Sequence, residues 1–517
     1  MLRTAKGLLG FCLLLVLGPV WQALGQGSDT DAAGRTPQEM SDRIDALLER
    51  GLLEQGWPAA ELCGDAEFLR RAHLDLTGQP PTASQVVSFC EKGGGAEQRR
   101  ELIDRLLASP RSANHLAATW TGWLLPEAGE TPGTPGNEGL QGWLRSRFAE
   151  NLRYDRLVSD LLVASGSPQS GPTAFFVALE GKPEKIAART ARVFLGLQLD
   201  CAECHDHPFD RWSQRDFWGF AAYFARLSIG EGMAMRPDAE VADVAAGEVR
   251  LPGEDEVVPP RPLVATGLSE VAFGSRRQQL ALWLTAPENP FVARAAVNRA
   301  WALLFGRGLI EPVDDMRNLE LASHPELLRE LADYFAASGY DLRELLAVLA
   351  NTQAYQRSGL HPSGIPPADS YAVMPAKPLT AAQMTASLAS VARQALGEDN
   401  SAAQQALQQQ LGTLRGDGNE AKLGVVAALV TLHGAAFDAV CRTQSSRLLK
   451  ALDAPHLDSR QQFRWLFLAT LNREPSPAEE QAFSQHLLAT SHDDPQGDWR
   501  SDLLWALLNS TEFAMTP

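Results

Sequence analysis

Apolar residues recur at helical spacing along most of this chain. Between Ser41 and Leu53, for example, Ile44, Leu47, Leu48 and Leu52 would share one face of a helix. Similar patterns predict helices over 65–76, 101–107, 113–125, 141–150, 154–163, 185–199 and 216–227, and then from Arg276 over 291–304, 324–337, 341–352, 380–396, 402–411, 435–452, 459–471, 477–489 and 500–510. The fold class expected from this pattern is mainly α.

Residues 229–270 interrupt the helical pattern. Gly, Pro, Asp and Glu dominate there, as in Pro252-Gly253-Glu254-Asp255-Glu256, while Val and Ala alternate between Val241 and Val249. We interpret this stretch as a linker with a small β element. Because 517 residues exceed one ordinary core, we expect two helical domains, at 36–228 and 271–517.

The two ends of the helical pattern resemble each other weakly. Leu74, Pro81-Thr82 and Phe89 match Leu468, Pro475-Ser476 and Phe483 at one constant offset, and each set is followed by a Leu-Leu helix, Leu102 to Ser109 and Leu503 to Ser510. A duplicated helical unit would explain the match. Independent use of the same turn chemistry would explain it too, and this second interpretation is favoured.

The N-terminus has the pattern of an export signal. Arg3 and Lys6 precede an apolar stretch over 7–17, and Ala23-Leu24-Gly25 offers small residues for cleavage, so we expect a signal peptide over 1–25. An uncleaved membrane anchor is the alternative. No later apolar stretch is long enough to span a bilayer, so we expect no transmembrane domain after cleavage and a periplasmic, cell-surface or extracellular location. The net charge of −17 argues against nucleic-acid binding.

The strongest chemical signal is Cys201-Ala202-Glu203-Cys204-His205. This C-x-x-C-H spacing attaches c-type haem: Cys201 and Cys204 would form thioethers with the porphyrin, and His205 would be the proximal iron ligand. In bacteria such attachment takes place outside the cytoplasmic membrane, which agrees with an export signal. Distal candidates are His324, which follows Ser323 in a capping-box pattern, and Met316, Met374 and Met384.

Two other interpretations of the motif stay open. Cys201, Cys204, His205 and His207 could together hold Zn, Cu or Fe without porphyrin, with Asp206 or Asp210 orienting an imidazole. Alternatively, the two motif cysteines form a structural disulfide. The remaining cysteines pose a separate question: Cys63 and Cys90 either pair in an oxidising compartment, or Cys63, Cys90 and Cys441 are three buried thiols that behave as small apolar residues.

Other candidates are weaker. Aromatic residues follow the motif, and Phe217, Phe220 and Phe224 would either line a porphyrin or, as we favour, form the core face of a helix. Arg299, Asp314 and Asp315 are candidates for a polar cluster in the second domain. The chain has no Gly-rich phosphate loop and no H-E-x-x-H pattern.

Several segments resemble one known bacterial domain. They are Phe68-Leu69-Arg70-Arg71, Leu74-Asp75-Leu76-Thr77-Gly78 and Phe194-Leu195-Gly196-Leu197-Gln198, which leads into the motif and its continuation Asp206-His207-Pro208-Phe209-Asp210. Together they are similar to the planctomycete-type secreted cytochrome-like domain of unknown function. Asn289-Pro290-Phe291, Phe305-Gly306-Arg307-Gly308-Leu309 and Ser323-His324-Pro325-Glu326-Leu327 are similar to its usual C-terminal partner domain. The resemblance implies an exported protein without a settled activity.

These observations favour an exported protein that binds haem c and takes part in electron transfer or a small redox reaction with a redox protein partner. One alternative is a metal-dependent enzyme, such as a hydrolase, that uses the Cys/His cluster. Another is a non-catalytic surface or scaffold protein in which the motif is structural.

Overall fold

The chain folds almost entirely into helices in a computed structural model that describes residues 34–125, 137–167, 171–230, 240–265, 274–396, 439–490 and 499–517. The predicted signal peptide and the helix predicted over 402–411 lie outside these residues. The first part contains α1 (Pro37–Gln55), α2 (Asp65–Thr77), α3 (Ala83–Glu91), α4 (Ala96–Leu107), α5 (Pro110–Leu124), α6 (Asn137–Ala149), α7 (Tyr154–Leu162), α8 (Ala174–Ala178), α9 (Pro183–Thr190) and α10 (Gln214–Ala221).

The second part is also helical, which confirms the mainly α class. It contains α11 (Arg276–Leu284), α12 (Pro290–Phe305), α13 (Pro325–Ala337), α14 (Leu342–Asn351), α15 (Gln353–Gln356), α16 (Ala381–Leu396), α20 (Arg447–Leu452), α21 (Ser459–Thr470), α22 (Pro477–Thr490) and α23 (Trp499–Leu508). Short helical turns of other types are η4 (Ala191–Leu195, a π-helix), η5 (Asp200–Glu203), η6 (Ala222–Phe224) and η7 (Leu319–Leu321).

Strands are few and short. In the predicted linker, β1 (Leu227–Ile229) pairs with β2 (Val241–Asp243), and β3 (Val249–Arg250) pairs with β4 (Val257–Val258). These antiparallel pairs confirm the expected minor β element. A third pair joins β5 (Lys377–Pro378) to β6 (Met515–Thr516), two segments that are far apart in sequence.

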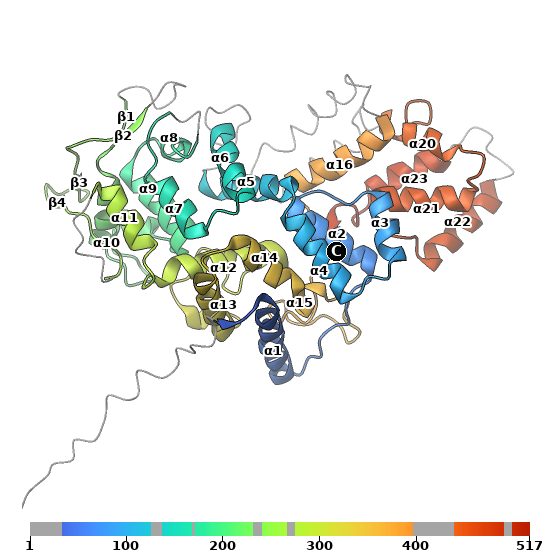
Figure 1. The fold of residues 1–517 in the computed structure, drawn as a ribbon, viewed down its shortest axis with the longest axis horizontal. Helices are drawn as coiled ribbons and strands as arrows, with labels where there is room; N and C mark the ends of the chain where they lie inside the picture. The colour runs from blue at the N-terminus through green and yellow to red at the C-terminus, as the bar shows by residue number, and fades with distance from the viewer. Residues whose placement is uncertain are drawn as a thin grey trace, which may run out of the picture.

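The main hydrophobic core includes residues on both sides of the linker. It runs from Met40 on α1 through the helices of the first part and on to Tyr355 on α15 and Met374. Contacts between α1 and α14, α7 and α11, and η4 and α12 hold these parts together. In Figure 1 the yellow α12–α15 accordingly lie between the green helices and the blue α1–α4.

A separate core forms nearer the C-terminus. It is built from residues of α16, α20, α21, α22 and α23, such as Leu388, Phe467 and Leu504. These helices occupy the right side of Figure 1 beside α3. The described ranges therefore contain two large apolar cores, and the first of them includes residues of both predicted domains.

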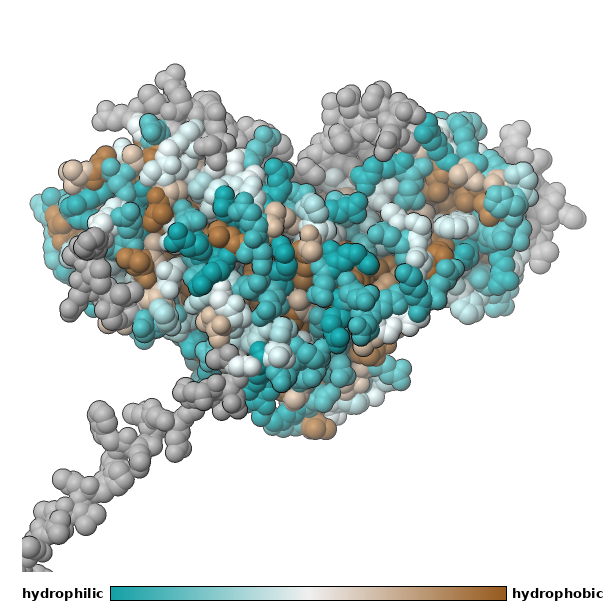
Figure 2. Space-filling view, viewed as in Figure 1, coloured by the Kyte–Doolittle hydropathy of each residue, from teal (hydrophilic) through white to brown (hydrophobic). Residues whose placement is uncertain are grey.

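The visible surface and the helices both bear on what a membrane-crossing element requires. Figure 2 shows a face that is mostly hydrophilic, with hydrophobic residues scattered over it. No helix within the described ranges is both long and apolar enough to cross a bilayer.

One predicted helix start is wrong in detail. The N-cap of α13 is His324 rather than Ser323, because Pro325 occupies the first helical position, and no side chain caps this end. The Ser323 amide instead donates to Leu309 O at 2.8 Å.

Candidate functional site

The C-x-x-C-H motif forms a tight, exposed helical turn. Cys201 lies within η5, and Cys204 follows directly at its C-terminal end with helical backbone angles. Because a 3₁₀ turn has roughly three residues, side chains at i and i+3 project from the same face. The two thiols are free and exposed, while Ala202 between them is buried. The turn therefore presents both sulfur atoms to solvent on one side.

The imidazole of His205 is oriented by its own backbone. Its Nδ1 lies 2.7 Å from Asp206 O, and since a carbonyl oxygen can only accept, Nδ1 carries the proton. The neutral ring then has its lone pair on Nε2. Ligating histidines commonly donate their second nitrogen to a carbonyl or carboxylate in this way.

His207 has the opposite arrangement. Its Nδ1 accepts the Phe209 amide at 3.3 Å, so in the neutral ring the proton is on Nε2 and the lone pair is already engaged. His207 also donates its own backbone amide to Trp212 O at 2.8 Å. Of the two histidines, only His205 is prepared to ligate a metal.

The two predicted orienting carboxylates hold the backbone instead. Asp206 Oδ1 accepts the Gln214 amide at 2.8 Å at the start of α10, and Asp210 Oδ1 accepts the Arg211 amide at 2.7 Å. Asp206 supports His205 through its carbonyl oxygen and not its side chain. Across the described ranges, no three His, Cys, Asp or Glu side chains converge as a metal-binding group.

The other side of the motif turn is fixed to α10. Glu203 O accepts hydrogen bonds from Gln214 Nε2 at 3.1 Å and from Trp218 Nε1 at 3.0 Å. Partial burial raises the pKa of the Glu203 carboxyl, and the nearby Glu184 and Asp200 carboxylates raise it further. The turn is thus anchored through its backbone while its thiols remain accessible.

The chain reaches the motif through a segment held by the second half of the protein. Gly196 ends the π-helix η4 at a φ of 66°, and its carbonyl accepts the Met316 amide at 2.7 Å. Arg299 on α12 donates to Arg192 O at 2.8 Å and to Val193 O at 3.1 Å. These contacts hold the π-helix that precedes the motif.

A polar cluster completes this support. Arg192 binds Asp314 at 3.1 Å and Asp200 at 2.6 Å, and Gln198 Nε2 donates to Asp314 Oδ1 at 2.9 Å. The sequence suggested Arg299, Asp314 and Asp315 as members of a polar cluster, but it did not show that the partners of Arg299 and Asp314 lie in the segment before the motif. Asp315 instead pairs with Arg317 at 2.7 Å. Arg192 and Gln198 were missed, since neither belongs to a recognisable pattern.

The four predicted distal ligands are not brought together at the motif. His324 contacts Gly51 and Tyr371, and burial lowers its pKa. Met374 is fully buried in the main core, and Met384 packs against the C-terminal core. Met316 packs against Gly196, on the approach to η5.

The aromatic residues after the motif belong mostly to the core. Phe217, Phe220 and Phe224 are fully buried, which agrees with the interpretation as a core face. Trp212 is also buried, beneath the Arg211 guanidinium at 4.6 Å. Phe209 is the exception, since it is 81% exposed. It is the apolar side chain that the motif segment offers to a bound group or a partner.

Of the other cysteines that the structure describes, Cys63 and Cys90 are free thiols. Cys63 and Cys441 are buried, whereas Cys90 is exposed, so the proposed Cys63–Cys90 disulfide does not form. Arg71 Nη1 lies 3.5 Å from Cys63 Sγ, and burial raises the pKa of the Cys63 thiol.

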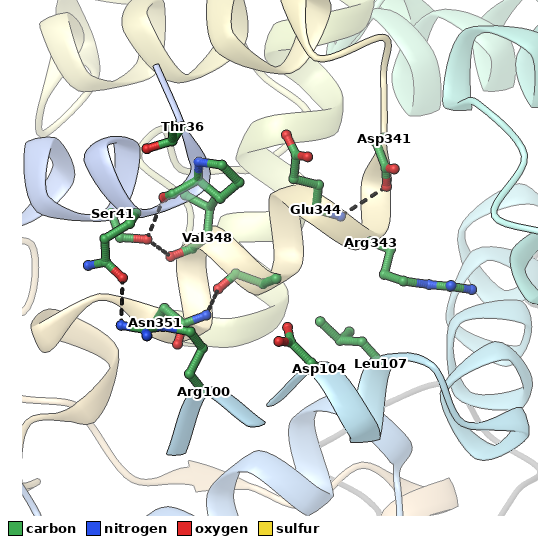
Figure 3. A pocket seen from close by; sticks show the side chains of 13 residues that line it. Thr36, Ser41, Arg100, Asp104, Leu107, Asp341, Arg343, Glu344, Val348 and Asn351 are labelled. Carbon is green, nitrogen blue, oxygen red and sulfur yellow. Dashed lines mark hydrogen bonds between the residues drawn. The ribbon is translucent and has the colours of Figure 1, made fainter. Parts of the chain in front are cut away.

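A cavity of about 580 Å³ lies away from the motif between α1, α4 and α14. Figure 3 shows Arg100, Asp104, Arg343 and Glu344 around it. Several charged groups already have partners: Arg100 donates to Gln38 at 2.8 Å, and Glu344 accepts the Tyr334 hydroxyl at 2.7 Å. This cavity is separate from the Cys201–His205 turn.

The motif residues fit covalent haem attachment better than a compact four-ligand metal site. Two thiols on one exposed face and a neighbouring imidazole with a free Nε2 are the groups that attachment and proximal ligation require. The four-ligand alternative needs His207, whose lone pair is engaged.

Two family models match the chain. Residues 43–228 match PSCyt2, described as a protein of unknown function (DUF1549), and residues 276–422 match PSD1, described as a protein of unknown function (DUF1553). Both ranges lie within the two domains predicted from the sequence. No curated protein and no solved structure shows significant similarity to the chain.

Proposed function

The chain belongs to the planctomycete cytochrome-like pair, a PSCyt2 domain followed by a PSD1 domain, and from that premise we propose that it is an exported protein that binds haem c covalently. The observation that best supports the proposal is the η5 turn, with Cys201 and Cys204 on one exposed face beside a His205 whose Nε2 is free. Bound haem would supply one-electron redox chemistry at iron.

The chain's own residues would fix and orient the group. Cys201 and Cys204 would hold it through thioethers, and the Nδ1–H bond to Asp206 O keeps His205 in the tautomer that could ligate iron through Nε2. Gln214 and Trp218 hold the turn itself through Glu203 O. Electron transfer or a small redox reaction is the function that this arrangement would support.

Location and partner follow from the same chemistry. Thioether attachment in bacteria takes place outside the cytoplasmic membrane, and the sequence carries an export-signal pattern. With a net charge of −17, the protein is suited to a redox partner that docks through a basic surface.

A haem stain after denaturing electrophoresis tests the proposal on full-length protein exported by a host with c-type maturation machinery. Wild type should give a haem band, and the double variant Cys201→Ser/Cys204→Ser should give none. Cys90→Ser is the matched control, because it removes an exposed thiol outside the motif and should retain the band. A wild-type protein without a band, in a host that loads a control cytochrome, would overturn the proposal and make analysis for Zn, Cu and Fe the next step.

A further inference from the structure

The weak sequence repeat corresponds to two helical units with the same local construction. In the first, Thr82 and Gln85 form a capping box at the start of α3, and in the second, Ser476 and Glu479 make the same reciprocal bonds at the start of α22. The unit α2–α3–α4 and the unit α21–α22–α23 thus share their turn chemistry as well as their order of helices. Figure 1 shows the two units next to each other.

The equivalence extends to the ends of the units. Gly78 and Asn472, at the same repeat position, both adopt a positive φ, 66° and 60°. Ser109 and Ser510, again equivalent, each donate their hydroxyl to the carbonyl three residues earlier, at 2.6 and 2.7 Å. So many shared details favour duplication over independent use of one turn.

Each unit has a groove lined from equivalent positions. The groove of the first unit has a volume of about 830 Å³, and that of the second about 390 Å³. Phe89 and Phe483 are equivalent wall residues, and so are Leu102 and Leu503. The two units therefore each form a groove at the same place, although the two grooves differ in volume.

The two grooves differ sharply in chemistry. Where the first has His73, Ser88 and Arg105, the second has Phe467, Ala482 and Ala506 at the equivalent positions. The second unit shows that the same arrangement of three helices can pack with apolar residues at these three positions. Other equivalent positions are polar in both grooves, with Gln85, Lys92 and Glu101 in the first and Glu479, His486 and Asp502 in the second. His73, Ser88 and Arg105 are therefore the polar residues that the packing of the unit does not require, and a ligand gives a reason for them.

His73 is the most informative of these residues. It is only 3% exposed, it lines the groove, and its Nδ1 lies 3.1 Å from Leu69 O. That bond places the proton on Nδ1, and no group in the described part of the chain pairs with Nε2. Burial lowers the pKa of His73 to about 4, with a smaller contribution from Arg105 and Arg111. A neutral acceptor thus lies in the groove wall.

The charges around the groove balance. Lys92 and Arg105 supply two cations, Glu97 and Glu101 supply two carboxylates, and none of the four makes an ion pair within the described ranges. A ligand with a net charge would meet as much repulsion as attraction. A molecule with many hydroxyl groups can donate to the carboxylates and to His73, and accept from the cations and from Ser88.

We propose that the groove between α2, α3 and α4 binds a neutral, hydroxyl-rich small molecule of the mono- or oligosaccharide class, recognised by His73, Ser88 and Arg105. A volume of about 830 Å³ accommodates one to a few sugar rings. The site is independent of the haem proposal, since it lies on different elements from η5.

The test uses the second groove as its template. His73→Phe/Ser88→Ala/Arg105→Ala gives the first groove the residues that the chain already carries in the second. Full-length wild type and variant are titrated with a panel of glucose, galactose, xylose, cellobiose and lactose, followed by saturation-transfer NMR. Glucuronate and glucosamine serve as charged analogues of matched shape.

We expect at least one neutral sugar to bind wild type, the variant to bind it at least tenfold more weakly, and both charged analogues to bind less well. Ala482→Ser, in the second groove, should leave the affinity unchanged. Three results would each overturn the proposal: no binding by any neutral sugar, equal binding by the triple variant, or preferred binding of a charged analogue. If the triple variant does not fold, Arg105→Ala alone removes an exposed side chain and must still weaken binding.

Discussion

The most demanding prediction concerns the buried ion pair between Asp75 on α2 and Lys377 on β5. Lys377 Nζ lies 2.8 Å from Asp75 Oδ1, and the side chains are 13% and 3% exposed. The Tyr355 hydroxyl donates to Asp75 Oδ2 at 2.9 Å. The pair ties the main core to the strand that leads into the C-terminal core.

Removing one partner should cost far more than removing both. Asp75→Ala leaves the Lys377 ammonium buried without a counter-charge and Tyr355 without its acceptor, for which we expect a loss of about 4 kcal/mol in the free energy of unfolding. Asp75→Leu/Lys377→Met replaces the pair by apolar groups, which is itself nearly neutral, but it leaves the Tyr355 hydroxyl and the Leu304 carbonyl without their partners and should cost about 1–2 kcal/mol. Burial already lowers the pKa of Lys377, so the penalty of Asp75→Ala should shrink as pH rises toward 10 and the amine loses its proton.

Urea unfolding at pH 7, followed by both tryptophan fluorescence and far-UV circular dichroism, measures these differences. The two probes are needed because a chain with two cores can unfold in steps. The reasoning fails if Asp75→Ala costs less than about 1 kcal/mol, or if the double variant is as unstable as Asp75→Ala.

Three further predictions follow from single features. Burial lowers the pKa of His73 to about 4, whereas in the unfolded chain it is about 6.5, so the unfolded chain takes up the proton first as the pH falls. The free energy of unfolding should therefore fall by about 3 kcal/mol between pH 6.5 and pH 4. His73→Phe should remove most of that slope in urea titrations at several pH values, and an unchanged slope would exclude this origin. Gly196→Ala would place a Cβ 2.7 Å from Met316 Sδ at a residue whose φ is 66°, so the melting temperature of this variant should fall by several degrees. Gly56 has a φ of 72° but open space around it, so Gly56→Ala should lower the melting temperature less. The fragment 271–517 lacks the partners of α11, α12 and α14 in the main core, so it should bind a hydrophobic dye and melt without a sharp transition; a cooperative melt would show that it folds alone.

The sequence was sufficient for features that depend on neighbouring residues. Helical spacing placed α1, α2 and α7, because a buried face requires apolar residues every three or four positions. Asn289-Pro290 marked the start of α12, where Asn289 Oδ1 accepts the Phe291 amide at 3.0 Å. The core role of Phe217 follows from the same periodicity.

Features that depend on distant residues could not be predicted in this way. The Gly- and Pro-rich linker suggests separation, yet the helices on its two sides share one core, since packing across helices leaves no local pattern. The support that Arg299 gives to the segment before the motif depends on α12 lying against η4, more than 100 residues away in sequence. Residue type and spacing identified such side chains as candidates, but their hydrogen-bond partners can be assigned only from the folded structure.

The shared core gives a physical reason for the two matched domains to occur together in this chain. The range matched by PSCyt2 contains the motif, but the π-helix before it is held by Arg299 and by Met316, which lie in the range matched by PSD1. Arg299 donates hydrogen bonds to two carbonyl groups of the π-helix, at 2.8 and 3.1 Å, because the π-helical geometry leaves these carbonyls available. The second domain therefore acts on the motif by positioning its backbone, and it contributes no residue that contacts Cys201, Cys204 or His205 among the hydrogen bonds of the described chain. On this basis the chemistry of the site belongs to the first domain, and its geometry depends on both.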